Sequence, residues 1–308
     1  MKMSFTWGKY KEQKQTCVET CFPCGRAPTY WSANWFSAIL HLLNGGITFI
    51  LYMDSDEKDN VYKLTETSAP WVPRVNGTCL GDLVPIAPDW CMDSVVESTS
   101  ELSLWWLVIA FHLLSFVFQW FAMFGWERTC GKCICSRDYR RDVEEDGTNM
   151  LRMIEYSISA TLMQISIALV LGVWERLAII GIGFLTAVCM LCGLIAEQLR
   201  TTNLAMAWTA HFTGWVAMIG VWSVLGRQFM YTVEVSKNDP PGFVFAIVIG
   251  IAVLYLGFGF VQTVQLALGQ TDKHNKNIEL AYCVMSITSK TFLGWMIFAN
   301  ALSGMSQN

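Results

Sequence analysis

Charged residues are scarce in this chain. They make up 15% of its 308 residues, whereas soluble globular proteins carry about 25%. Apolar residues account for 53%, and the mean hydropathy is +0.38. The charges gather between apolar runs that are long enough to cross the roughly 30 Å apolar core of a bilayer as helices. This pattern excludes a soluble protein, gives no reason to expect a nucleic-acid partner, and predicts a polytopic membrane protein.

Residues 1–30 lack an apolar run, so we expect no cleavable signal peptide. Beyond them, the hydropathy predicts an all-α membrane protein with seven transmembrane helices in residues 31–302. The expected spans are 31–53, 102–126, 150–174, 176–199, 204–226, 241–268 and 278–302.

The distribution of lysine and arginine indicates how the spans are oriented. With a cytoplasmic N-terminus, the cytoplasmic segments carry about twice as many of these residues as the extracellular ones, as the positive-inside rule requires. We therefore expect the segments 1–30 and 127–149 in the cytoplasm. The 54–100 loop and the C-terminal tail 303–308 would be extracellular.

Cysteines occur on both expected sides of the membrane. The 54–100 loop contains Cys79, Cys91 and a glycosylation sequon at Asn76. An oxidising exterior favours a disulfide between the two cysteines; the alternatives are two free thiols packed under the loop, and an unused sequon.

Two CxxC elements lie in the expected cytoplasmic segments, Cys21 with Cys24 and Cys130 with Cys133. Two such pairs are a common pattern for a tetrahedral zinc site, which we give as one hypothesis. The alternative is free or palmitoylated cysteines next to the membrane.

Ionisable residues are rare inside the expected spans, and none of these spans contains an aspartate. Their burial costs several kcal/mol unless they are paired, so each is a candidate functional residue. The deep ones are His41, His112, Arg152, Glu155, His211 and Lys290. We expect water to reach the acids at or near span ends, which are Glu101, Glu175, Glu197 and Glu279.

Lys290 lies about 18 Å into the last span, near the midplane of the bilayer, and is too deep to reach either surface comfortably. A desolvated amine is a nucleophile that forms a Schiff base with an aldehyde. The alternative is a structural Lys–Glu pair between two helices.

Two motifs support the first interpretation. They are Arg152-Met153-Ile154-Glu155-Tyr156-Ser157-Ile158-Ser159 in the third span and Ser286-Ile287-Thr288-Ser289-Lys290 in the seventh. With these motifs, the buried His41 and His112 and an inside N-terminus, the chain resembles the heliorhodopsins, a family of retinal-binding seven-helix proteins. The resemblance extends over all seven spans and implies a rhodopsin-like bundle.

The resemblance implies all-trans-retinal bound to Lys290 as a Schiff base, with Glu155 as the counterion of the protonated form. Arg152 lies one helical turn from Glu155 and is expected to orient its carboxylate. Residues expected to line or support the pocket are Tyr156, Ser159 and Ser286. Further pocket candidates are Trp215, Tyr255, Phe258 and Gln262.

The depths of these residues do not all agree. His41 and His112 lie at about the depth of Lys290, which favours a shared polar network over two histidines satisfied separately in the core. Glu155, however, lies only about 8 Å into its span. Either the third helix begins earlier than residue 150, or the lysine side chain descends toward the cytoplasm. We interpret His211 as a packing residue or a helix–helix hydrogen bond.

A pump needs acids in series, and Glu155 is the single deep acid expected here, so we predict a light sensor that signals to an unknown partner. The alternative is a light-gated passive proton conductance through Glu197, Glu101 and the histidines. No catalytic constellation beyond Lys290 suggests an enzyme. By resemblance, a homodimer through the fourth and fifth spans is expected.

Overall fold

The computed structural model describes residues 29–54, 62–68, 71–73, 84–87, 90–92, 95–124, 139, 142–235, 242–268 and 271–305. Seven of the described helices are long and apolar enough to cross a membrane, which confirms the predicted fold class. They are α2 (Thr29–Asp54), α3 (Leu104–Phe124), α5 (Met150–Val170), α6 (Arg176–Leu199), α7 (Leu204–Val235), α8 (Gly242–Ala267) and α9 (Asp272–Met305).

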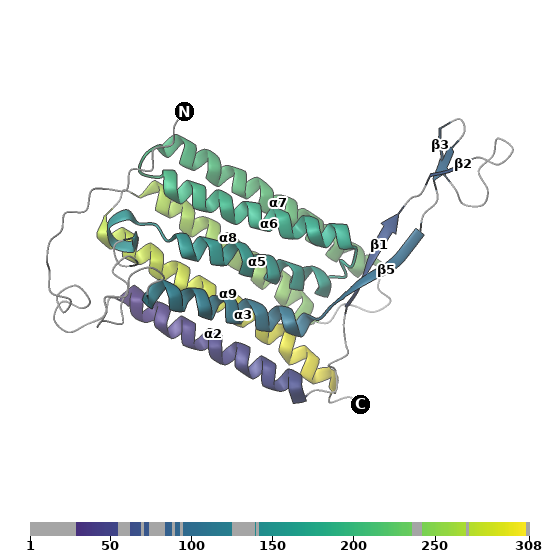
Figure 1. Cartoon of the computed structure of the whole chain (residues 1–308), viewed down its shortest axis with the longest axis horizontal. Helices are drawn as coiled ribbons and strands as arrows, with labels where there is room; N and C mark the ends of the chain where they lie inside the picture. Colours follow the sequence, from purple (N-terminus) through teal and green to yellow (C-terminus); the bar gives the residue numbers. More distant parts are fainter. Residues whose placement is uncertain are drawn as a thin grey trace.

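The seven helices lie side by side as one bundle (Figure 1). Each packs against the next along the chain, and α9 packs back against α2, so the ring closes. We call the end at which α2, α5, α7 and α9 begin the polar end, and the opposite end the strand end.

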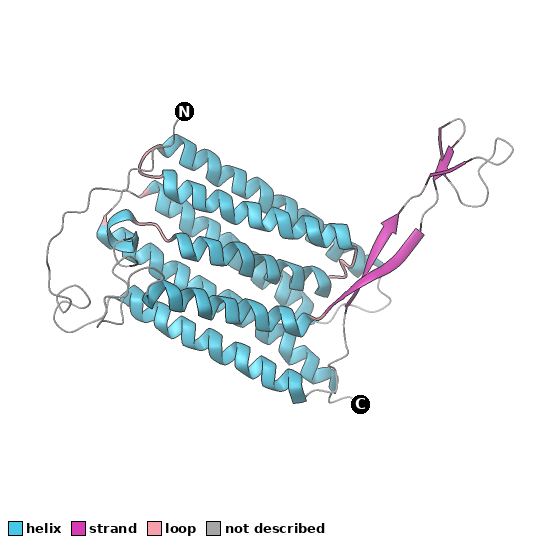
Figure 2. Cartoon of the chain, viewed as in Figure 1, coloured by secondary structure: helices cyan, strands magenta, loops and turns pink. Residues whose placement is uncertain are grey.

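Short strands project beyond the strand end (Figure 2). Strand β1 (Tyr62–Ser68) pairs with β5 (Val95–Leu102), and a small sheet has the order β2 (Trp71–Pro73), β4 (Trp90–Met92), β3 (Val84–Ala87). The amide of Thr65 donates to the carbonyl oxygen of Trp174 at 2.9 Å, which ties β1 to the turn between α5 and α6. Cys79, Asn76 and the side chain of Cys91 lie outside the described residues, so the disulfide and the glycan stay predictions.

The interior of the bundle differs between its two halves. Toward the strand end it is mainly apolar, although Gln164 and Ser166 of α5 are also buried there. The apolar side chains of this half that are 0% exposed are Phe111, Ile167, Leu225, Ile247, Ile251 and Leu293. Toward the polar end it contains buried polar and charged side chains, which the next section describes. Outward-facing side chains such as Phe184 and Val216 are apolar and each 70% exposed, as contact with lipid requires.

The helix limits differ from the prediction most at the end of the fifth span, where α7 continues to Val235 instead of ending at residue 226, and at the start of the last span. Helix α9 begins at Asp272 rather than at residue 278, whereas α5 begins at Met150 as predicted. Asn149 caps α5, its side chain accepting from the amide of Arg152 at 3.0 Å. Before it, the short π-helix η2 (Asp142–Asp146) and Gly147 pack over the polar end of the bundle.

The first testable prediction concerns the effect of a substitution at Gly147 on stability. Gly147 has φ +61°, and a Cβ there would collide with the side chains of Arg200 and Asn275. Gly147→Ala is therefore expected to lower the free energy of unfolding by about 1–3 kcal/mol, measured as thermal unfolding in detergent by tryptophan fluorescence. The control is Gly226→Ala in α7, where a Cβ meets nothing within 4 Å. Equal melting temperatures for the two variants would contradict the packing described for Gly147.

Candidate functional site

The structure places Lys290 of α9 against Glu155 of α5. Lys290 Nζ lies 2.5 Å from Glu155 Oε1, and the two side chains are 3% and 2% exposed. Lys290 Nζ also donates to Ser115 Oγ at 2.6 Å and to Ser286 Oγ at 3.2 Å, and Ser115 Oγ donates to Glu155 Oε1 at 2.6 Å. The buried ammonium therefore has a counter-charge and further hydrogen-bond partners, which a charge in this environment requires.

Ser115 of α3 is the contact of Lys290 that the sequence does not single out. The one sequence feature that points to Ser115 is its position. It follows His112 by one helical turn, so the two residues share a face of α3. Serine is too common inside helices for this position alone to mark a site.

The meeting of Lys290 and Glu155 resolves the mismatch in their depths. Because α5 begins at Met150 as predicted, an earlier start of the third helix is not the reason. The lysine side chain instead runs back along its own helix, as helical side chains do, and its Nζ reaches the hydroxyl of Ser286 one turn earlier. The group that pairs with Glu155 thus lies nearer the polar end than the Lys290 backbone.

His41 of α2 and His112 of α3 are also brought together. Their Nδ1 atoms lie 3.1 Å apart, and the side chains are 0% and 1% exposed. Gly294 of α9 leaves room for the His112 ring, because a Cβ there would lie 2.9 Å from its Nε2. The pair occupies the space between α2, α3 and α9, within electrostatic range of Lys290. A shared network with Lys290 remains a prediction.

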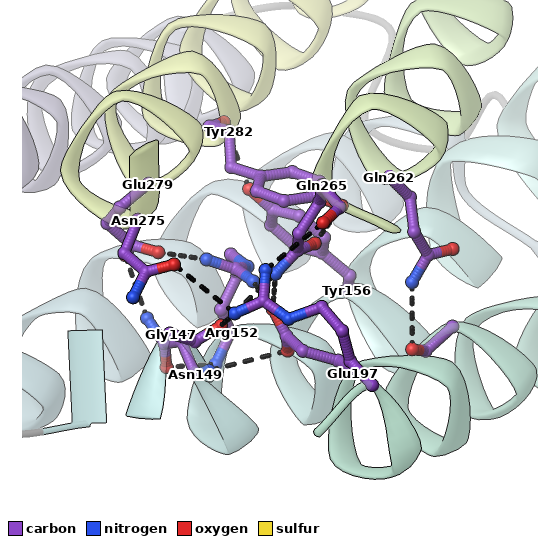
Figure 3. Close-up of polar contacts among 12 residues, drawn as sticks. Gly147, Asn149, Arg152, Tyr156, Glu197, Gln262, Gln265, Asn275, Glu279 and Tyr282 are labelled. Atoms are coloured by element: carbon purple, nitrogen blue, oxygen red, sulfur yellow. Dashed lines mark hydrogen bonds and ion pairs between the residues drawn. The ribbon is translucent and has the colours of Figure 1, made fainter. Parts of the chain in front are cut away.

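Arg152 does not take the place expected for it. Instead of orienting Glu155, it forms ion pairs with Glu197 of α6, at 2.5 Å, and with Glu279 of α9 (Figure 3). The expectation that water reaches these two acids is wrong, since Glu197 is 1% and Glu279 3% exposed. The physical reason is that α9 begins earlier than predicted, and that Tyr139 and residues 142–149 cover the helix ends.

Hydrogen bonds extend this group into what we call the Arg152 cluster, made up of Arg152, Glu197, Glu279, Tyr139, Asn149 and Gln265. Asn149 Nδ2 donates to Glu279 Oε1 at 2.8 Å, and Gln265 Nε2 donates to Glu197 Oε1 at 2.7 Å. The ring of Tyr282 lies 4.0 Å from the guanidinium carbon of Arg152. Figure 3 shows the side chains of α5, α6, α8 and α9 converging here.

Tyr139, which precedes η2, donates its hydroxyl to Glu279 Oε1 at 2.9 Å. Burial, and then the negative charge of Glu279, raise the pKa of Tyr139 well above its usual value. The phenol therefore stays protonated at neutral pH and remains a donor to the carboxylate.

Two neighbouring cavities, one of which adjoins Lys290, are lined by most of the predicted pocket residues. One, of about 320 Å³, is lined by Lys290, Ser159, Tyr156, Tyr255 and Phe258 among others. The second, of about 540 Å³, shares the last three and is also lined by Trp215 and Gln262. Because the two cavities share these walls, free space continues from Lys290 toward α6, α7 and α8.

His211 of α7 forms the helix–helix hydrogen bonds expected of it. Its Nε2 accepts from Trp215 Nε1 at 3.0 Å, so Nδ1 carries the proton and donates to Gln262 Oε1, also at 3.0 Å. These bonds hold the Trp215 ring over Gly259, which has no side chain to displace it.

The four cysteines of the zinc hypothesis, Cys21, Cys24, Cys130 and Cys133, lie outside the described residues. Within the described part of the chain, no group of three or more His, Cys, Asp or Glu residues could hold a metal ion. Zinc thus has no structural support.

Comparison with known proteins agrees with this architecture. The heliorhodopsin family model matches residues 31–302, which include all seven membrane-long helices. No curated protein matches the chain. Membership of that family makes this a retinal-binding, multi-pass membrane protein that senses light or is driven by it. The chain belongs to the heliorhodopsin family.

Proposed function

We propose that the protein is a light sensor in which all-trans-retinal is bound to Lys290 as a protonated Schiff base with Glu155 as counterion. The observation that carries the proposal is the buried Lys290–Glu155 pair, 2.5 Å apart, beside a cavity. A protonated imine keeps the positive charge that Glu155 already balances, so the site needs no new countercharge when the amine is modified.

The cavities suit an elongated apolar ligand with one charged end. Their shared walls are Tyr156, Met190, Tyr255 and Phe258, and polar groups gather at the Lys290 end. The hydroxyl of Ser159 lines the cavity beside Lys290 and has no partner among the described residues. When bound, retinal would supply visible absorption and a light-driven change of shape at the Lys290 nitrogen.

The protein's own groups would hold the proton at that nitrogen. Glu155 Oε1 is placed to accept it, and Ser115 stabilises the carboxylate by donating at 2.6 Å. The Tyr156 ring, centred 5.1 Å from Lys290 Nζ, presents its face to the positive charge. A displacement of the nitrogen would thus change contacts with α3, α5 and α9 at the same time.

The choice between a sensor and a proton conductance rests on the two halves of the interior. Glu197 and Glu279 are buried, so the sequence-based argument that a second deep acid is lacking no longer holds. The strand half, however, is packed with apolar side chains such as Phe111, Ile251 and Leu293. A proton path across the whole membrane would have to cross this layer, which favours the sensor. Glu101, part of the alternative path, is exposed at the end of β5.

Two further parts of the proposal concern the surroundings of the protein. The excess of lysine and arginine in the sequence before α2 and in the sequences that connect α3 to α5, α6 to α7 and α8 to α9 supports a cytoplasmic N-terminus and an extracellular C-terminus. The family resemblance supports a homodimer through α6 and α7. The partner that receives the signal is not identified.

Replacing the counterion tests the proposed site. As the pH is raised, the visible absorption band disappears when the Schiff base loses its proton. In Glu155→Gln we expect this to happen at a pH more than about one unit lower than in the wild type. Removing one partner of a buried ion pair costs about 3–5 kcal/mol, and one pH unit corresponds to about 1.4 kcal/mol. The measurement is a pH titration of the absorption spectrum after reconstitution with retinal. Glu234→Gln, at an exposed position of α7, is the matched control. A titration of Glu155→Gln that coincides with the wild type would reject Glu155 as counterion.

Photocurrents separate the sensor from the conductance. In voltage-clamped cells with a pH gradient, the sensor is expected to give no steady photocurrent, because the apolar strand half interrupts the path. Colourless Lys290→Ala provides the background. A steady current that depends on Lys290 and reverses with the proton gradient would establish the conductance instead.

A further inference from the structure

Tyr139 and residues 142–149, which we call the end segment, lie over the polar end and are held there by several helices. Glu144 of η2 accepts from the hydroxyl of Tyr30 on α2 at 2.8 Å and pairs with Lys276 of α9 at 3.4 Å. Asn275 of α9 donates to the backbone oxygen of Glu144 at 3.2 Å. These contacts fix the middle of the segment to the first and last helices.

Two other helices hold the turn that follows η2. The carbonyl oxygen of Gly147 accepts from Arg200 Nη2 at 3.1 Å and from Gln265 Nε2 at 3.2 Å. Arg200 follows the end of α6, and Gln265 belongs to α8. The left-handed backbone of Gly147 brings this carbonyl oxygen within reach of both donors.

Glu279 holds both ends of the segment. Its Oε1 accepts from Tyr139 at 2.9 Å and from Asn149 at 2.8 Å, while its Oε2 pairs with Arg152. Arg152 is thus shared between two buried carboxylates, Glu279 and Glu197, and the second of these also lies within electrostatic range of Arg200. A hydrogen bond to an ionised acceptor is about twice as strong as one to a neutral acceptor. The strength of the hydrogen bonds that hold the segment therefore depends on Glu279 being ionised.

A cavity connects this carboxylate to the Lys290 site. Its lining includes Glu155, the partner of Lys290, as well as Arg152 and Glu279. The oxygen Oε1 of Gln119, which also lines it, is buried without a partner among the described residues, and so is Nε of Arg152. A cavity that contains unpaired polar groups of this kind is where buried water binds. Water there would link Glu155 to Glu279.

We propose that Glu279 accepts the proton that leaves the Lys290 nitrogen after light absorption, and that its neutralisation releases Tyr139 and residues 142–149. This inference rests on the proposed function. The N–H bond at Lys290 breaks, Glu155 and cavity water relay the proton, and an O–H bond forms at Glu279, with no change of oxidation state. The neutral acid loses its attraction to Arg152 and becomes a weaker acceptor for Tyr139 and Asn149.

The charged and titratable groups around Glu279 fit this role. Arg152 of α5 faces it directly, Tyr139 donates to it, and Tyr282 and Cys283 flank it on α9. Arg152 keeps Glu197 as partner when Glu279 is neutral, so no unpaired guanidinium is left in the interior. The released segment would be the part of the protein that transmits the signal.

The first test is light-minus-dark infrared spectroscopy of the retinal-loaded protein. We expect a C=O stretch of a newly protonated carboxyl group in the wild type, its loss in Glu279→Gln, and its persistence in Glu197→Gln. A band that persists in Glu279→Gln, or that is lost in Glu197→Gln alone, would overturn the assignment. If the wild type forms no light-responsive pigment, the proposed function fails and this inference with it.

The second test is hydrogen–deuterium exchange of the segment, followed by mass spectrometry. In the wild type, amides of residues 142–149 are expected to exchange about tenfold faster in light than in the dark, as loss of a charge-assisted hydrogen bond predicts. Glu279→Gln should show the fast rate already in the dark.

Tyr139→Phe keeps the test decisive if Glu279→Gln does not fold. It removes the phenol hydroxyl and leaves the carboxylate, so it should speed exchange in the dark while the infrared band persists. Exchange that is equal in dark and light in the wild type would refute release of the segment.

Discussion

The ion pair between Lys290 and Glu155 is the constraint on which the rest of the interior depends. Removing two charges from water costs several kcal/mol for each ion, and mutual attraction compensates only with good geometry and additional hydrogen bonds. The protein provides both, with a 2.5 Å contact and the hydroxyls of Ser115 and Ser286. Three helices must therefore keep their relative positions, so any change at the Lys290 nitrogen acts on all of them.

The polar half of the bundle extends the same principle toward one end. Arg152 follows the cap of α5 one turn before Glu155, and Glu279 precedes Lys290 on α9. Each member of the central pair therefore shares a helix with a member of the Arg152–Glu279 pair. The strand half is packed mainly with apolar side chains instead. This asymmetry favours a protein that converts a local charge movement into rearrangement at one end, rather than one that carries ions across.

Much of this was predictable from the sequence because ionisable residues are rare in membrane spans. Lys290, Glu155, His41 and His112 stand out for that reason, and the seven helices follow from hydropathy. The Arg152 cluster was not predictable in the same way, because a residue near a span end looks accessible until a folded loop covers it. The early start of α9 was missed because residues 272–277 are polar and extend the helix beyond the apolar run.

The central claim is that Lys290 carries the chromophore beside Glu155. The most direct measurement is borohydride reduction of the retinal-loaded protein under illumination, which converts an imine to a stable amine, followed by peptide mass spectrometry. The account predicts a retinyl adduct on the peptide that contains Lys290 and on no other lysine peptide. A coloured protein whose adduct lies on another lysine would contradict it.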